Sequence, residues 1–183
     1  MPEWGRILLG GLGCFVLAWG GLVLDAKVGG LPLWLADALL IFLVLGRSGT
    51  SLAAVLAAGA IGILASHWVH GHTIAATAAH TAAAVAEALI ARWALARFAP
   101  VAAQLENAGS LVRLLLWAGA LPAVAGAALA GLGAVADGYP ERAVPAFANW
   151  WCAVAVGSCV LLPTLLALDN RKRVVVDAHY QTS

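Results

Sequence analysis

Charged residues are scarce in this chain of 183 residues, where Asp, Glu, Lys and Arg make up 10% of the sequence, against about 25% in soluble domains. Hydrophobic residues make up 63%, more than a soluble core of this size could enclose. Lipid is therefore the expected solvent, and the lipid bilayer is the first partner that the sequence predicts. The formal net charge of +1 gives no indication of an acidic partner, so we expect no nucleic acid.

Cysteine is rare as well, and Cys14, Cys152 and Cys159 all lie inside apolar runs. An odd number of cysteines at such positions does not suit a disulfide framework, so we expect free, buried thiols. The sequence also lacks a nucleophile elbow, a P-loop and a zinc-protease motif, and no polar stretch is long enough for a catalytic domain. We predict that the chain as given is not an enzyme and uses no cofactor.

Long apolar runs are what the sequence does contain. Six can be counted, at residues 7–24, 31–46, 50–69, 74–98, 111–136 and 145–168. About 20 apolar helical residues cross the hydrocarbon core of a bilayer, so the fold class that we predict is all-α, a bundle of six transmembrane helices. The first run exceeds a typical signal-peptide core and lacks a following A-x-A site, so we expect it to be retained. Residues 1–168 would form this domain, with 169–183 as a short cytoplasmic tail or the start of an output domain.

The basic residues predict the orientation of the bundle. With a cytoplasmic N-terminus and six alternating spans, eight of the ten basic residues fall on the cytoplasmic side, namely Arg6, Arg47, Arg92, Arg97, Arg113, Arg171, Lys172 and Arg173. Only Lys27 and Arg142 fall outside. This bias follows the positive-inside rule and predicts that both termini are cytoplasmic. The expected location is a bacterial inner membrane, which the chain crosses several times.

Small residues recur every four positions in two of the runs. They are Ala54, Ala58, Gly62 and Ser66 in the third run, and Ala123, Ala127 and Gly131 in the fifth. Such stripes let helix backbones approach closely in lipid. Pro122 lies within the fifth run and should bend that helix, because it removes one backbone hydrogen bond.

Glu87 is the first candidate for a functional site, because it lies near the middle of the fourth run. A carboxylate at that depth costs at least about 2.5–3.5 kcal/mol, so its side chain should face the protein interior and have a partner. His80 and Thr77 lie on the same helix face towards the outer side. One interpretation is a polar pocket that binds a ligand or a proton. The other is a protonated Glu87 whose hydrogen bond only serves helix packing.

Asp37 is the second candidate, about two turns from the outer end of its run. It either lines the outer mouth of the same pocket or reaches the interface near Lys27, and Asn149 lies at a depth where it could be its partner. Trp150 and Trp151 follow Asn149 near the outer end of the last run, where tryptophan favours the membrane–water interface. We include Asn149 and both tryptophans among the predicted ligand-binding residues.

Three histidines, His67, His70 and His72, cluster where the third run ends. His67 and His70 share a helix face, a spacing that can hold a metal. A metal site needs three or four convergent ligands, however, and no cysteine or carboxylate lies close in sequence to complete one. We therefore prefer an ordinary interfacial cluster and predict no metal site.

Several short motifs resemble those of a known family. The last run has Phe147, Trp150 and Trp151, then Gly157 and Pro163 at six-residue intervals; the fourth run has Glu87 followed by Arg92 and Arg97; and an early Trp34 precedes a short apolar stretch that ends in Gly46 and Arg47. Together they resemble the bacterial membrane-associated sensor domain of the first type, the MASE group. The chain departs from that pattern after the tryptophan pair, where Ala153 and Val154 replace Gly-Asp.

The resemblance implies a function. Domains of that group precede histidine kinases and diguanylate cyclases, so the chain is expected to be a sensor of two-component or cyclic-nucleotide signalling. It would detect a small molecule or a membrane partner and relay the signal to a cytoplasmic output domain or partner protein. A homodimer is expected if the chain is part of a kinase or cyclase. The alternative is a small-solute-binding membrane subunit of a transporter.

Overall fold

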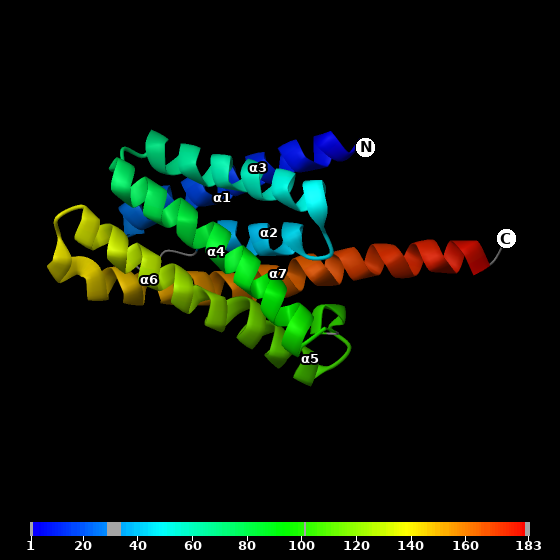
Figure 1. Cartoon of the computed structure of the whole chain (residues 1–183). Coiled ribbons are helices and arrows are strands. Elements are labelled where there is room, and N and C mark those ends of the chain that lie inside the picture. The colour runs from blue at the N-terminus through cyan, green and yellow to red at the C-terminus, as the bar shows by residue number, and fades with distance from the viewer. Residues whose placement is uncertain (1, 29–33, 101, 182–183) are drawn as a thin grey trace.

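The computed structural model describes residues 2–28, 34–100 and 102–181, with side chains as far as Asn170. The fold is all-α, as predicted, and the described residues contain no strand. In chain order (Figure 1) the elements are α1 (Glu3–Val28), α2 (Leu35–Val44), α3 (Gly49–Val69), α4 (Ile74–Phe98), the 3-10 turn η1 (Ala102–Gln104), α5 (Ala108–Leu114), the π-helical segment η2 (Leu115–Ala120), α6 (Leu121–Ala136), the 3-10 turn η3 (Pro140–Arg142) and α7 (Ala143–Gln181).

The prediction of six membrane-spanning helices is wrong, because five helical segments are long and apolar enough to cross a membrane. These segments are Glu3–Lys27, Gly49–Val69, Ile74–Phe98, Ala108–Ala136 and Pro140–Asn170. The predicted span at 31–46 contains only the ten-residue helix α2, which at 1.5 Å per residue covers about half of a bilayer core. Its first residues, 31–33, lie outside the described part of the chain. The five long apolar helices indicate a membrane protein.

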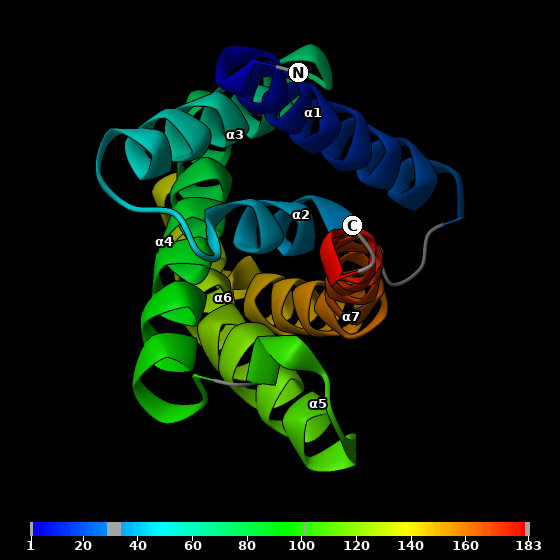
Figure 2. The ribbon, with the colours of Figure 1, turned by 90° about the vertical axis from the view of Figure 1, so that its right-hand side faces the viewer.

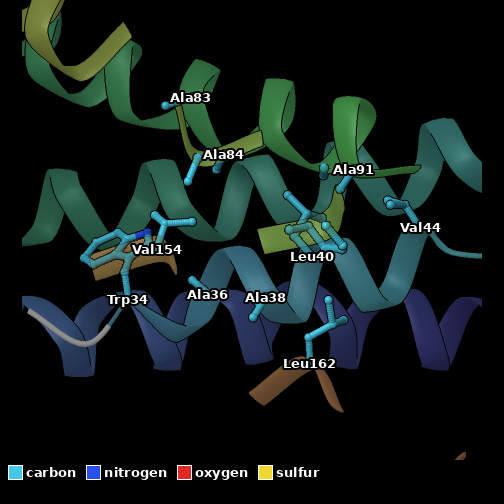
Figure 3. Close-up of a cluster of buried hydrophobic side chains, with 14 of the residues drawn as sticks. Trp34, Ala36, Ala38, Leu40, Val44, Ala83, Ala84, Ala91, Val154 and Leu162 are labelled. Atoms are coloured by element: carbon cyan, nitrogen blue, oxygen red, sulfur yellow. The ribbon is translucent and has the colours of Figure 1, made fainter. Parts of the chain in front are cut away.

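The short helix α2 lies in the middle of the bundle and contacts α1, α3, α4 and α7 (Figure 2). Ala36, Ala38, Leu40 and Val44 are buried, and in Figure 3 they lie beside alanines of α4 and beside Val154 and Leu162 of α7. Protein therefore surrounds α2, which explains how a helix too short to cross lipid is accommodated.

The chain still reverses direction across α2, so both termini lie at the same end of the bundle (Figure 1). α2 ends next to the turn that holds Arg47, and Arg47 Nη1 lies 3.9 Å from the carboxylate of Glu3 at the start of α1. Arg92 of α4 donates to the backbone oxygen of Arg47 from Nε at 3.1 Å and from Nη2 at 2.6 Å. This end, with Glu3, Arg47, the loop after α4 and the start of the polar tail, is called the tail end below.

Glycine allows a close contact between α1 and α3. A Cβ added at Gly62 of α3 would collide with the backbone oxygen of Gly11 in α1, and one added at Gly11 would lie 2.8 Å from the backbone oxygen of Ala58. The stripe of small residues predicted in the third run therefore does mediate helix packing. The opposite side of α1 carries Leu8, Leu12 and Val16, each more than half exposed, as expected for side chains that face lipid.

The fifth predicted span is one continuous helical segment with a widened turn. Residues Leu115–Ala120 form a π-helix immediately before Pro122. A proline cannot donate to the preceding turn, and π-helical turns are one way to accommodate the resulting break. The indole of Trp151 in α7 donates to the backbone oxygen of Ala120 at 3.1 Å.

A histidine and carboxyl cluster at the end opposite the termini

The turn between α3 and α4 begins the site. Gly71 has a φ of +84°, its N–H donates to the oxygen of Trp68, and the N–H of His72 donates to the oxygen of His67 at 3.1 Å. This is the Schellman arrangement that ends many helices, and it needs glycine at the left-handed position. The turn brings His72 back beside His67, one turn before the end of α3.

Thr73 fixes the start of α4. Its hydroxyl oxygen accepts the N–H of Ala76 at 3.1 Å and so caps the helix. The same hydroxyl lies 2.7 Å from both carboxylate oxygens of Asp137, which follows α6, and donates to them. Asp137 is thereby held beside the turn that carries His72.

Three imidazoles from the α3–α4 hairpin converge. His67 comes from α3, His72 from the turn and His80 from α4; the ring centroids lie 4.9 Å apart for His67 and His72, 4.7 Å for His67 and His80, and 5.9 Å for His72 and His80. One nitrogen from each ring can be chosen so that all three lie within 4.8 Å of one another. Burial, together with the nearby His70, lowers the pKa of His72, while Asp137 opposes that shift. His72 therefore favours the neutral form.

His67 is buried without a hydrogen-bond partner. Its side chain is 1% exposed, and neither Nδ1 nor Nε2 has a partner within the described residues. Nδ1 of His80 is likewise buried and unpartnered there. Buried polar atoms in folded proteins are nearly always satisfied, so these nitrogens are available to bind another group.

Two tryptophans enclose the imidazoles. The ring of Trp150 in α7 stacks on His80 with 4.7 Å between centroids and 18° between planes. Trp34, immediately before α2, lies 5.4 Å from the ring of His67 and 5.5 Å from that of Trp150. Backbone contacts with α7 fix the position of Trp34. Its N–H donates to the backbone oxygen of Ala153, and its backbone oxygen lies so close to Gly157 that a Cβ added at Gly157 would collide with it.

A pair of carboxyl groups lies next to the tryptophan rings. Asp37 of α2 and Glu87 of α4 are both 0% exposed and lie close together, without completing a hydrogen bond of good geometry between their side chains. The indole N–H of Trp150 donates to Oε1 of Glu87 at 2.7 Å. That of Trp34 lies near Asp37 without completing a hydrogen bond of good geometry. Within the described residues no lysine or arginine forms an ion pair with either group, so no basic side chain there offsets a negative charge on the pair.

Gly126 of α6 makes the room for Glu87. A Cβ added at this position would overlap the carboxyl of Glu87. Trp150 therefore connects the imidazoles with the carboxyl pair, since its ring contacts His80 and its N–H binds Glu87.

A cavity of about 180 Å³ adjoins the imidazoles. Its walls include the three imidazoles and both tryptophans, together with Leu22, Asp25, Ala130, Ala146, Asn149 and Ala153. These residues come from the last part of α1, the start of α2, the α3–α4 hairpin, α6 and the first part of α7, and the cavity lies at the end opposite the termini, called the pocket end below. The arrangement provides aromatic walls, three imidazoles and, next to them, a buried carboxyl pair.

The structure brings together four of the predicted site residues: Glu87, His80, Asp37 and Trp150. The predicted partner of Asp37, Asn149, instead lines the cavity from an exposed position, and Glu87 takes its place beside Asp37. Thr77 is buried on α4 but is not among the residues that line the cavity. Trp151 is 39% exposed, donates to the backbone oxygen of Ala120 at the end of η2, and is not among the residues that line the cavity.

Trp34, His67 and His72 were not among the predicted site residues. The sequence did hold one indication, because His67 and His80 are placed six residues before and seven residues after Thr73. Positions at equal distances from the turn of a helical hairpin lie at the same depth. Trp34 had no comparable indication, since its contact with His67 depends on how α2 packs inside the bundle. No protein-family model, curated protein or solved structure matches this chain.

Proposed function

We propose that the protein is a membrane sensor module that binds a small ligand at the pocket end and transmits the change through α7 to a cytoplasmic output domain or partner. The resemblance to the MASE sensor group supports this proposal from the sequence. The support from the structure is the position of α7 relative to the cavity.

The observation that carries the proposal is the continuity of α7. This helix runs over 39 residues, from beside the pocket to the polar tail (Figure 1). Its first turns carry Asn149 and Trp150 at the cavity, and Asn170 contacts the backbone oxygens of Ala103 and Gln104 at the tail end. A ligand that displaces Trp150 therefore acts directly on the element that leads to the tail.

The orientation that we propose places the pocket end outside and the tail end in the cytoplasm of a bacterial inner membrane. The support is the charge distribution: Arg47, Arg92, Arg97 and Arg113 flank the tail end, as the positive-inside rule requires. The side chains of the basic cluster at 171–173 lie outside the described part of the chain. A topology reporter at Gln104 should signal cytoplasm, and one at Gly138 should signal the outside.

The sensor proposal can be tested with a chimera in which α7 is joined in frame to the catalytic part of a histidine kinase. Glu87→Leu removes the hydrogen bond from Trp150 and the carboxyl group beside Asp37, so we expect the output to be locked at one level. Glu87→Gln keeps the shape and the hydrogen bond to Trp150, and it should alter the output less. The amount of each variant in the membrane is measured in parallel.

The exposed residue Leu89 lies two positions from Glu87 on the lipid-facing side of α4, so Leu89→Ala is the matched control and should signal as the parent does. If Glu87→Leu responds like the parent at equal abundance, the carboxyl pair serves packing alone and the sensor proposal is wrong.

A further inference from the structure

We propose that His67, His72 and His80 form a binding site for a divalent transition-metal ion of the zinc class. Metal binding as such is independent of the proposed function; only the role of the metal as the sensed ligand rests on it. The prediction of no metal site considered ligands close in sequence, whereas the third imidazole comes from the next helix.

The distances between the three imidazole nitrogens would fit a metal ion after a small movement of the side chains. The three nitrogens lie within 4.8 Å of one another, whereas nitrogens about 2.1 Å from a tetrahedral Zn²⁺ lie about 3.4 Å apart. With the buried His67 fixed, the nitrogens of His72 and His80 would each have to move by at most about 1.4 Å, which rotation of their imidazoles can supply because both are only partly buried.

The unpartnered nitrogens of His67 are the second, independent observation. An imidazole that is 1% exposed would normally hold a hydrogen bond on at least one nitrogen, yet neither nitrogen has a partner within the described residues. A bound cation satisfies such a nitrogen, and the neighbouring imidazoles supply the other ligands.

The donor set selects the class of metal. Three neutral imidazoles suit Zn²⁺, Cu²⁺ and Ni²⁺, whereas Mg²⁺ and Ca²⁺ prefer oxygen ligands. Three protein ligands also leave a fourth position open, as in zinc sites that exchange a bound molecule. Here the adjoining cavity of about 180 Å³ gives water or a small anion access to that position.

Asp137 supports the site from outside the ligand set. Its carboxylate interacts electrostatically with His72 and His80, and Thr73 holds it in place with 2.7 Å contacts. A carboxylate near metal-binding imidazoles is a frequent supporting element, because it orients the rings and increases their basicity. Asp137 comes from the end of α6, so metal binding would also tie α6 to the α3–α4 hairpin.

The test uses the full chain in lipid nanodiscs, purified with an affinity tag that contains no histidine. Cys14, Cys152 and Cys159 are replaced by alanine, so that thiolates cannot bind the probe. Zn²⁺ is titrated calorimetrically, and Co²⁺ replaces it to report coordination geometry by visible absorption. We expect one ion per chain and a tetrahedral Co²⁺ spectrum.

His72→Asn is the main variant, because His72 lies in a turn and its loss should not disturb the helices. We expect it to weaken Zn²⁺ binding by at least about 100-fold. His70→Asn is the matched control, since His70 is exposed two residues away and outside the three-histidine set, and it should bind Zn²⁺ as the parent does. His80→Asn provides a second test from α4, with the same expected loss of affinity.

The proposal is overturned if the parent binds no Zn²⁺, or if His72→Asn and His80→Asn bind it as tightly as the parent. A loss with His70→Asn equal to that with His72→Asn would also contradict it, because binding would then occur at the surface turn. If Zn²⁺ binds at the histidines and the kinase chimera does not respond to it, the metal site stands and the role of the metal as the sensed ligand is wrong.

Discussion

The two ends of the bundle differ in how completely their buried polar side chains are hydrogen-bonded. At the tail end, Arg92 donates twice to the backbone oxygen of Arg47, Arg47 lies 3.9 Å from Glu3, and Asn170 donates to backbone oxygens of the loop after α4. At the pocket end, His67 and Asp37 are almost wholly buried, and neither ring nitrogen nor carboxyl oxygen has a complete hydrogen bond within the described residues.

This difference distinguishes polar groups that are satisfied within the fold from polar groups that are not. A buried polar atom without a partner costs about 1–3 kcal/mol, so an uncompensated cluster of them would weaken the fold. The tail end avoids that cost by binding backbone oxygens and by exposure. We infer that the pocket end retains the cost because its groups are completed by a proton or a ligand.

Gly126→Ala should have the largest effect on stability, because its methyl group would overlap the carboxyl of Glu87 in a filled core. We expect a loss of about 1–3 kcal/mol in the free energy of unfolding, measured by SDS-induced unfolding in mixed micelles. The matched control is Gly119→Ala, where the added Cβ would lie 3.4 Å from that of Ser158, an ordinary contact. Equal stability of the two variants would show that Glu87 can leave its position freely.

Trp150→Phe should have the next largest effect. The aromatic ring beside His80 is kept, but Oε1 of Glu87 loses the indole N–H that lies 2.7 Å away. We expect a loss of about 1–2 kcal/mol in the same assay. Trp151→Phe, the control one residue on, removes a donor from an exposed indole and should change stability by under about 0.5 kcal/mol. A larger loss at Trp151 would reverse the contrast between buried and exposed donors.

Arg92→Ala tests the tail end and should have the smallest effect of the three. It removes two hydrogen bonds to the oxygen of Arg47 from a partly buried position, so we expect a loss of about 1 kcal/mol. The control is Arg97→Ala, since Arg97 is exposed and contacts only the ring of Phe98 among the described interactions. Output of the kinase chimera should not change in either variant. A lost response in Arg92→Ala would place part of the sensing function at the tail end.

The sequence predicted the long helices because a run of apolar residues is a local property. It failed at α2, since the run at 31–46 resembles a short span whether lipid or protein surrounds it. The alanines of the fourth run suggest a central helix, whereas the structure places α2 in the centre with Ala83, Ala84 and Ala91 of α4 against it. Which helix is enclosed depends on all the crossings in the bundle, and no single segment encodes that.

The site was partly predictable for the same reason. Glu87 and His80 are recognisable because an ionisable group within an apolar run is costly wherever it packs. Their partners are not, since Asp37 joins Glu87 and Trp34 joins His67 only through tertiary contacts of α2. The role of Gly126 could not be predicted either, because the sequence does not distinguish a glycine that makes room for a carboxyl group from one that lets two helices pack closely.

The central claim is that occupancy of the pocket is transmitted along α7, and one measurement tests it most directly. Spin labels are placed at Thr50 and Leu168, both exposed at the tail end, in the cysteine-free chain in nanodiscs. Pulsed electron–electron resonance then gives the distance between them with and without Zn²⁺. We predict a shift of about 1–2 Å that is absent in His72→Asn, as expected for a displaced signalling helix. Identical distance distributions at saturating, bound Zn²⁺ would contradict the claim.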